Sequence, residues 1–275
     1  MQSGRTFTSV VLFLGTSYLV IVTIIALSQR SLIYQPWHDD DNALIAQAET
    51  FGLLPWLDGS GQRIGWICQD KGQGSPVLIM HGNAGHALFR MYLVDCFQAA
   101  SDPAAIAILE YPGYGSRPGT PGRETLVTAA VQAIELLHRQ TRKPVLLVGE
   151  SIGSVVAGEA AAQRPELIAG LLMLTPMNSL KDVAQHHFWF LPIGLILQDR
   201  YDLEYALRGM KVPMAVVLAE KDNIVPRLFG EKLYDSYTGP KKCWTALGSS
   251  HNEMPYHSEP EFWKQIFDFL KTAPL

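Results

Sequence analysis

Residues 146–155, LLVGESIGSV, place Ser151 between two glycines at the end of an apolar run. The run is typical of a buried strand, and the Ala-, Val- and Gly-rich residues after the serine are typical of a closely packed helix. A strand, a tight turn and a helix in this order form the setting of the G-x-S-x-G nucleophile elbow. The five-residue pattern alone is weak, because a plain strand-to-helix connection gives the same letters. Whether Ser151 is a nucleophile or part of a plain strand-to-helix connection depends on the residues at the other strand ends.

The composition fits one large folded domain and argues against a nucleic-acid partner. Of the 275 residues, 48% are hydrophobic and 17% are charged, which is enough apolar chain for a substantial core. The net charge of −4 and the pI of about 6.1 leave no basic field for phosphate backbones. Cys68, Cys96 and Cys243 form no CxxC pair, so we expect neither a zinc site nor a disulfide framework. A single bridge between two of them stays open for an oxidising compartment.

Short apolar runs alternate with amphipathic stretches over most of the chain. Strands are expected at 76–83, 104–115, 143–151, 167–176, 213–222 and 241–251, and helices at 124–140, 152–163 and 259–273. Continuous apolar strands that alternate with helices predict an α/β fold, with a mainly parallel central sheet and helices on both of its faces. In such sheets function gathers at the carboxyl ends of the strands.

One segment breaks the alternation. Residues 177–211 contain the apolar run FWFLPIGLIL at 188–197, and we expect a small helical insertion that forms a lid. The run has two interpretations, core packing or contact with an acyl chain. The pair His186–His187 has no carboxylate or cysteine at ligand spacing, so we expect a solvated or lid position and no metal.

A base and an acid for Ser151 occur at later strand ends. Asp222 ends the strand PMAVVLAEK, and His251 lies in the loop GSSHNE. A serine hydroxyl needs a base to take its proton, and the base needs an acid to orient it. The order Ser, Asp, His is that of the α/β-hydrolase arrangement. The alternatives are Glu220 and Glu253 for the acid and His257 for the base.

Backbone N–H groups are expected to hold the negative charge that develops on a substrate oxygen. The first donor is Ile152, which follows the nucleophile, and the second is Asn83 or Ala84 in the loop HGNAGH at 81–86. His81 in the same loop is expected to have a structural role. Tyr111 and Tyr114 are expected either to line the pocket mouth or to pack the turn.

The N-terminus has the composition of a membrane span. No charged residue occurs from Thr6 to Gln29, and this apolar stretch is long enough to cross a bilayer as one helix. A cleavable signal peptide with ALS at 26–28 is the alternative, although the run is longer than usual for one. We expect a single-pass anchor at 1–30 and a hydrolase domain at 31–275. Arg5 and the free amine lie before the span, and Arg30 lies after it, followed by the acidic residues 39–41. This balance favours a catalytic domain outside the cytoplasm, on the periplasmic side of a bacterium, by a single charge.

These segments together resemble a known family. The anchor, followed by RSLIYQP, HGNAG, YPGYGSRPGTP, GESIGS, EKDNIVP and GSSHNE, is similar to the α/β-hydrolase superfamily. More closely, it resembles the membrane-anchored bud-emergence-type serine hydrolases and their bacterial relatives. The resemblance covers nearly the whole chain and implies an α/β-hydrolase fold. It also implies that Ser151 is the nucleophile, Asp222 the orienting acid and His251 the general base.

The expected function is therefore that of a serine hydrolase. It cleaves an ester or thioester of a small or lipid-like acyl substrate through an acyl-enzyme, as carboxylesterases, lipases and thioesterases do, and without a cofactor or metal. An amidase or peptidase with the same three residues is one alternative. A non-catalytic, membrane-tethered binder of an acyl ligand or a partner protein is the other. The oligomeric state and the natural acyl group do not follow from the residues.

Overall fold

Eight strands form one central sheet in the computed structural model, which describes residues 2–68, 72–254 and 260–272. The strands are β1 (Gln35–Pro36), β2 (Leu54–Leu57), β3 (Arg63–Cys68), β4 (Val77–Met80), β5 (Ala84–Gly85), β6 (Ile106–Leu109), β7 (Val145–Glu150), β8 (Ile168–Leu174), β9 (Met214–Ala219) and β10 (Lys241–Ala246). The α-helices are α1 (Gln2–Ile33), α2 (Asp41–Thr50), α3 (Met91–Ala100), α4 (Arg123–Thr141), α5 (Ile152–Gln163), α6 (Leu180–His187), α7 (Ile193–Ile196), α8 (Leu203–Ala206), α9 (Arg227–Ser236) and α10 (Pro260–Thr272). Two short 3-10 helices, η1 (Ala87–Arg90) and η2 (Pro165–Leu167), complete the described elements.

The strand order in the sheet is β10-β9-β8-β7-β4-β6-β3-β2. Strands β4, β6, β7, β8, β9 and β10 pair in parallel, whereas β3 pairs antiparallel with both β6 and β2. The prediction of a mainly parallel sheet is confirmed. The antiparallel edge was not anticipated, because alternation along the chain does not give strand direction. Strands β1 and β5 form a separate small parallel pair.

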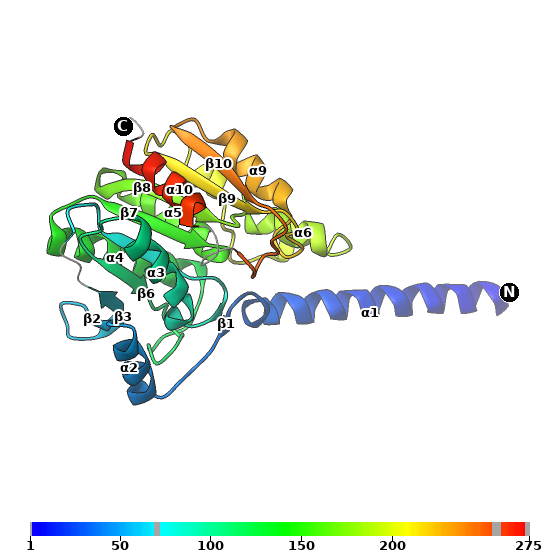
Figure 1. Cartoon of the computed structure of the whole chain (residues 1–275). Coiled ribbons are helices and arrows are strands. Elements are labelled where there is room, and N and C mark those ends of the chain that lie inside the picture. The colour runs from blue at the N-terminus through cyan, green and yellow to red at the C-terminus, as the bar shows by residue number, and fades with distance from the viewer. Residues whose placement is uncertain (1, 69–71, 255–259, 273–275) are drawn as a thin grey trace.

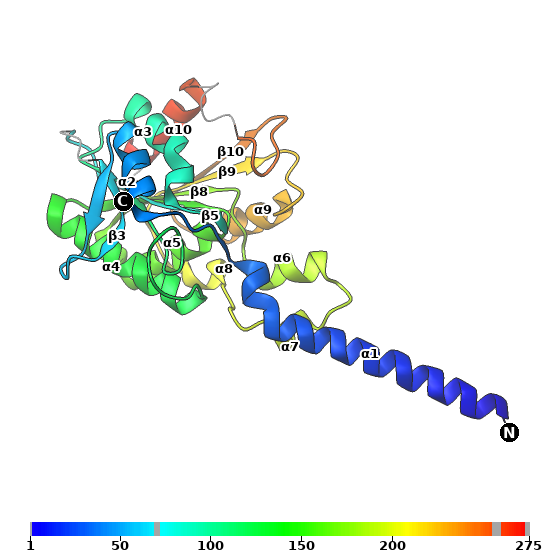
Figure 2. The same ribbon diagram turned by 90° about the horizontal axis from the view of Figure 1, so that it is seen from below.

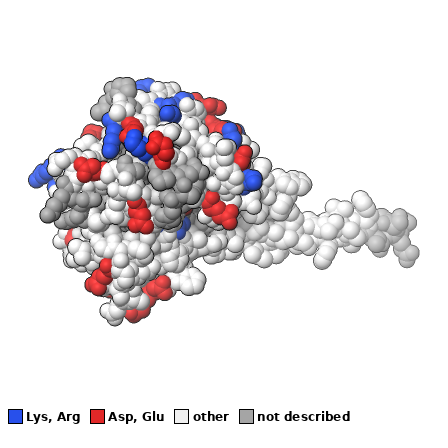
Figure 3. Space-filling model, viewed as in Figure 1, with Lys and Arg blue, Asp and Glu red and all other residues white. Residues whose placement is uncertain are grey.

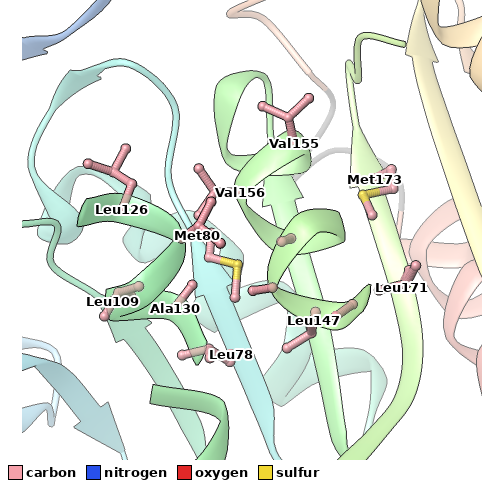
Figure 4. Packing of buried hydrophobic residues seen from close by; sticks show 14 of the residues in the cluster. Leu78, Met80, Leu109, Leu126, Ala130, Leu147, Val155, Val156, Leu171 and Met173 are labelled. Carbon is pink, nitrogen blue, oxygen red and sulfur yellow. The ribbon is translucent and has the colours of Figure 1, made fainter. Parts of the chain in front are cut away.

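Helices cover both faces of the sheet, because successive residues of a strand point to opposite faces. Leu78 and Met80 of β4 pack under α4 and α5, and Val77 and Ile79 of the same strand pack on the side of α2, α3 and α10. Figure 4 shows the first of these layers, in which side chains of α4 and α5 meet Leu109, Leu147 and other strand residues. The core is therefore two apolar layers that share the sheet.

The segment between β8 and β9 departs from the alternating pattern and carries the short helices α6, α7 and α8. This segment, residues 177–211, is called the insertion below. The N-terminal part of helix α1 projects from the body, and α6 and α7 lie beside its other end (Figures 1 and 2). Residues Phe7–Ile33 have the length and composition of a membrane span, with a mean hydropathy of 2.6.

The parallel strands bring polar segments to one edge of the sheet. Residues 81–86 follow β4, Ser151 follows β7, Asp222 comes shortly after β9, and His251 comes shortly after β10. Parallel strands have their carboxyl ends on the same edge, so these four segments meet there. This edge holds the candidate site.

Candidate active site

Ser151 occupies a strained turn between β7 and α5. Its φ of 54° and ψ of −120° are sparsely populated by residues with a side chain, at a cost of about 1–3 kcal/mol. The turn is tight: a Cβ on Gly149 would lie 2.5 Å from the carbonyl oxygen of Gly153, and a Cβ on Gly153 would lie 2.2 Å from that of Met80. Both glycines of the motif are therefore required by close backbone contacts.

His251 connects Ser151 to Asp222. Its Nε2 lies 3.0 Å from the Ser151 hydroxyl, and its Nδ1 lies 2.7 Å from Oδ2 of Asp222. The other carboxylate oxygen, Oδ1, accepts the backbone N–H groups of Ile224 and Val225 at 3.0 and 2.8 Å. The Asp222 side chain is only 2% exposed. The carboxylate is thus fixed by backbone donors and presents one oxygen to the imidazole.

The rival residues have other partners or lie elsewhere. Glu220 accepts the backbone N–H of Gly248 at 2.7 Å, and Glu253 accepts the hydroxyl of Ser250 at 2.8 Å. Both contacts stabilise the loop that carries His251. His257 lies outside the described residues. Of the candidate acids, Asp222 is the one that the structure places on the imidazole.

The two candidate donors of the 81–86 loop differ in position. Asn83 lines the same pocket as Ser151 and Ile152. Ala84 pairs with β1 and lines a different cavity, next to Trp37 and Phe89. Ile152 is the first residue of α5, where backbone N–H groups point out of the helix and the helix dipole favours negative charge. The geometry therefore favours Asn83 over Ala84 as the partner of Ile152.

Buried tyrosines stabilise this loop from below. The hydroxyl of Tyr111 donates to the carbonyl of His81 at 3.0 Å, and that of Tyr114 donates to the carbonyl of Asn83 at 2.8 Å. Both side chains are fully buried. They therefore pack the turn and do not line the pocket mouth, so the second of the two interpretations is correct.

Glu150 has a role that the motif did not suggest. Its carboxylate accepts hydrogen bonds from Nε of Arg90 and from the hydroxyl of Tyr92 at 2.9 Å. These partners lie in η1 and α3, which follow the 81–86 loop. The guanidinium of Arg90 also packs against Gly82. Glu150 thus ties the turn of Ser151 to the loop that carries Asn83.

A buried acid lies beneath the same loop. Oε1 of Glu110 accepts the N–H of Ala87 at 3.0 Å, and burial raises the pKa of Glu110 to about 7. Nε2 of His81 is 3.7 Å from that oxygen. Burial holds the pKa of His81 well below its usual range, so its imidazole is neutral and its role is structural. Glu110 was not predicted from the sequence. Its position was a usable signal, because it is a charged residue directly after an apolar strand.

The pocket at Ser151 has a volume of about 470 Å³, within the range of small-molecule sites. Among its described lining residues none is Asp, Glu, Lys or Arg, and most are aliphatic. The walls come from the insertion and, unexpectedly, from the end of α1. A second cavity of about 560 Å³ lies at the amino ends of the strands, near Pro103 and Pro144, and contains none of the candidate residues.

The residues of the apolar run 188–197 lie in three different environments. Leu191, Ile193 and Leu197 are buried in a small cluster with Val22 and Ile25 of α1, and all three also line the pocket. In contrast, Trp189 is 77% exposed and Leu195 is 83% exposed. Nε2 of His187 donates to the carbonyl oxygen of Ile224 at 2.8 Å. The run is thus part core, part pocket wall and part exposed surface.

The fold is that of the α/β hydrolases. Residues 77–210 match the family model described as "Alpha/beta hydrolase family". An uncharacterized protein of Mycobacterium tuberculosis is 29% identical over 239 residues, which cover 85% of this chain and 84% of that protein. A yeast protein described as an uncharacterized membrane protein (Saccharomyces cerevisiae) is 25% identical over 94% of this chain and 95% of its own length.

More narrowly, the relatives include the bud-emergence type and a lipase. Protein bem46 of Schizosaccharomyces pombe is 28% identical over 54% of this chain and 52% of its own length. The lysophosphatidylserine lipase ABHD12 of Danio rerio is 22% identical over 79% of this chain and 64% of its own length. An esterase of Pyrococcus furiosus has the same fold, with a TM-score of 0.67, 15% identity, and coverage of 88% of this chain and 97% of that one. The resemblance stated from the sequence is confirmed.

Proposed function

We propose that this protein is a membrane-anchored serine hydrolase that cleaves an acyl ester or thioester. The observation that carries the proposal is the bridging position of His251, 3.0 Å from the Ser151 hydroxyl and 2.7 Å from the Asp222 carboxylate. A strained serine and a helix N-terminus at the same point add a poised nucleophile and oxyanion donors.

The chemistry follows from these positions. Nε2 of His251 takes the proton of Ser151 as Oγ attacks the acyl carbonyl, and Asp222 stabilises the imidazolium through Nδ1. The oxyanion of the tetrahedral intermediate accepts N–H groups of Ile152 and Asn83, each worth about 2.7–4 kcal/mol of transition-state stabilisation in comparable sites.

Collapse of this intermediate then breaks the bond to the leaving alcohol or thiol, which receives its proton from His251. Water attacks the acyl-enzyme with His251 again as the base, and the acid is released. These steps need no cofactor.

The pocket supports a lipid-like acyl group as substrate. It presents aliphatic side chains next to Ser151, with polar groups only from a few residues such as Gln29, Asn83 and His187. A relative named as a lysophosphatidylserine lipase and a fold shared with an esterase agree with that class. We infer that the insertion acts as a lid over this pocket.

The domain organisation proposed is an anchor at 1–30 and a hydrolase domain at 31–275. Helix α1 is long and apolar enough to cross a membrane, and a relative is described as a membrane protein. The single positive charge of Arg5 before the span supports a catalytic domain outside the cytoplasm.

The test compares two serines of the same turn. Ser151→Ala is expected to lower kcat for p-nitrophenyl butyrate by at least about 10⁴-fold. Ser154→Ala is the matched control, because the Ser154 hydroxyl is buried and donates to the carbonyl of Ser151 at 2.6 Å. It is expected to retain turnover. Activity of Ser151→Ala near that of the wild type would overturn the proposal.

A further inference from the structure

Helix α1 contributes a wall of the pocket that holds Ser151. Its last turns supply Ile25, Gln29, Leu32 and Ile33 to the lining, opposite aliphatic residues of α6 and α7. A helix that served only as a tether would have no reason to border the nucleophile. The wall therefore calls for an explanation beyond anchoring.

Specific polar contacts fix α1 against the insertion. The amide of Gln29 donates to the carbonyl of Ile196 at 2.9 Å, and its oxygen accepts the N–H of Gln198 at 2.8 Å. Arg30 binds both carboxylate oxygens of Asp199, at 3.0 and 2.9 Å. Gln29 and Asp199 are buried, whereas the side chain of Arg30 is 52% exposed. The Gln29 contacts are therefore shielded from water, and the two-oxygen contact of Arg30 adds a second attachment that orients the helix.

The end of α1 is also bonded to the loop that carries the proposed oxyanion donor. The side-chain amide of Asn83 donates to the carbonyl of Ile33 at 3.2 Å. The backbone N–H of Gln35, just after the helix, donates to the carbonyl of Asn83 at 3.0 Å. A displacement of α1 would therefore displace Asn83.

The contact face of α1 extends far along the helix. The hydroxyl of Tyr18 donates to the carbonyl of Phe190 at 2.8 Å, and Val22, Ile25 and Gln29 follow at the three- and four-residue spacing of one helix face. The tip of the insertion thus lies beside the middle of the apolar helix. The Tyr18 hydroxyl thus provides a hydrogen-bond donor for the Phe190 carbonyl. Backbone carbonyls in the hydrocarbon of a bilayer need such a partner within the protein.

The length of α1 then places this tip in the membrane. The segment from Phe7 to Ser17, which lies beyond the Tyr18 contact, is about 16 Å long, only about half of a hydrocarbon core of roughly 30 Å. If α1 crosses a bilayer, the hydrocarbon must reach past Tyr18, to about Ala26. Phe188, Trp189 and Phe190 are then at membrane depth, and Ile25 lies at the border.

The surface of the insertion suits that location. Residues 183–198 contain no Asp, Glu, Lys or Arg, and Phe188, Trp189, Phe190 and Leu195 are exposed. On the face seen in Figure 3, the charged side chains lie on the body, while the described part of the projecting helix is white. Phe and Leu side chains are favoured in the hydrocarbon of a bilayer, so this surface fits the depth that the length of α1 gives it.

We propose that α1 is part of the substrate site, and that the acyl chain of a bilayer-resident ester enters the pocket from the membrane along the face of α1 that contacts the insertion. This inference rests on the proposed hydrolase function and assigns Ile25 as a residue that determines acyl-chain specificity. A short acyl group reaches Ser151 without contacting this wall. A long chain occupies the space beside Ile25.

Two adjacent isoleucines give a matched test. Ile25 lines the pocket, whereas Ile24 is 58% exposed and faces outward. The full chain is reconstituted in phosphatidylcholine vesicles, and kcat/KM is measured for p-nitrophenyl butyrate and p-nitrophenyl palmitate. Ile25→Trp is expected to lower the palmitate value about tenfold or more relative to the butyrate value. Ile24→Trp is expected to leave the ratio unchanged.

The outcomes separate this inference from the function itself. If the ratio of kcat/KM for palmitate to kcat/KM for butyrate is the same in Ile25→Trp, Ile24→Trp and the wild type, α1 has no role in the substrate site. The hydrolase proposal would still stand. Wild type that hydrolyses neither ester would remove the proposed function and this inference with it. Retained butyrate turnover by Ile25→Trp shows that the variant has folded.

Membrane contact of the insertion is tested by fluorescence in the same vesicles. Phosphatidylcholine brominated on its acyl chains quenches tryptophans that lie in the hydrocarbon. Wild type is expected to lose a larger fraction of its emission than Trp189→Phe. An identical fractional loss for the two proteins would place Trp189 in water and contradict entry from the bilayer.

Discussion

Glu110→Gln should make the protein more stable above neutral pH. Glu110 is 2% exposed and lies under the 81–86 loop, with Oε1 on the N–H of Ala87. Burial raises its pKa from 4.5 to about 7. Between these values the native protein holds a proton that the unfolded chain releases, so the free energy of unfolding falls as the pH rises through this window.

The difference between a pKa of 4.5 in the unfolded chain and about 7 in the native protein corresponds to about 3 kcal/mol of unfolding free energy, since each pKa unit is worth about 1.36 kcal/mol. Glutamine keeps the acceptor for Ala87 and carries no charge at any pH. The variant and the wild type should therefore be similar near pH 4.5, and the variant should be more stable by about 3 kcal/mol at pH 8. Burial lowers the pKa of His81 and of His86 in the native protein, and both imidazoles stay buried in the variant, so the difference between the two curves reports mainly on Glu110.

The assay is denaturant unfolding of the full chain in detergent micelles, followed by tryptophan fluorescence from pH 4.5 to 8. Glu49→Gln, at an exposed position on α2, is the control and should change stability by less than about 0.5 kcal/mol. The reasoning would be refuted if the free energies of unfolding of Glu110→Gln and wild type changed in parallel with pH, or if the variant were the less stable protein at pH 8.

Two further substitutions test the geometry of the site. Asp222→Asn should lower kcat/KM for p-nitrophenyl butyrate by about 10⁴-fold, because the amide no longer holds His251 in the tautomer that accepts the serine proton; a loss below tenfold would contradict the assigned acid. Gly153→Ala should destabilise the fold by more than about 2 kcal/mol in denaturant unfolding, because its Cβ would meet the carbonyl of Met80. Gly59→Ala, whose Cβ meets nothing within 4 Å, should change stability by less than about 1 kcal/mol, and equal effects at the two glycines would argue against a tight elbow.

The fold could be predicted because its strands are buried on both faces. Runs such as the one before Ser151 are continuous and apolar, and the helices between them have helical periodicity, so the predicted helix at 124–140 is close to the observed Arg123–Thr141. Strand ends then place Ser151, Asp222 and His251 at one edge. That inference uses local patterns along the chain and one topological rule.

Contacts between distant segments could not be predicted in the same way. Arg30 and Asp199, or Gln29 and Ile196, are far apart in the sequence, and no local pattern pairs them. The apolar composition of α1 explains a membrane span equally well with or without a pocket wall. One signal was available: Gln29 and Arg30 end an otherwise apolar helix, and polar side chains there need partners.

Glu150 illustrates a different limit. The motif fixes it next to the nucleophile, yet its side chain points to Arg90 and Tyr92, which only the fold brings near. Likewise, the sequence left Asn83 and Ala84 equivalent, and the structure differs between them in that Asn83 lines the pocket of Ser151 whereas Ala84 lines another cavity. Both cases depend on side-chain or backbone direction, which residue spacing does not give.

The central claim is that the Ser151 hydroxyl, activated by His251, forms the bond to the acyl group. The most direct measurement treats the full-length wild type and Ser151→Ala with a fluorophosphonate and maps the modified peptide by mass spectrometry. The account predicts one covalent adduct, located on Ser151 and missing from the variant. An adduct on another residue, or equal labelling of Ser151→Ala, would contradict it.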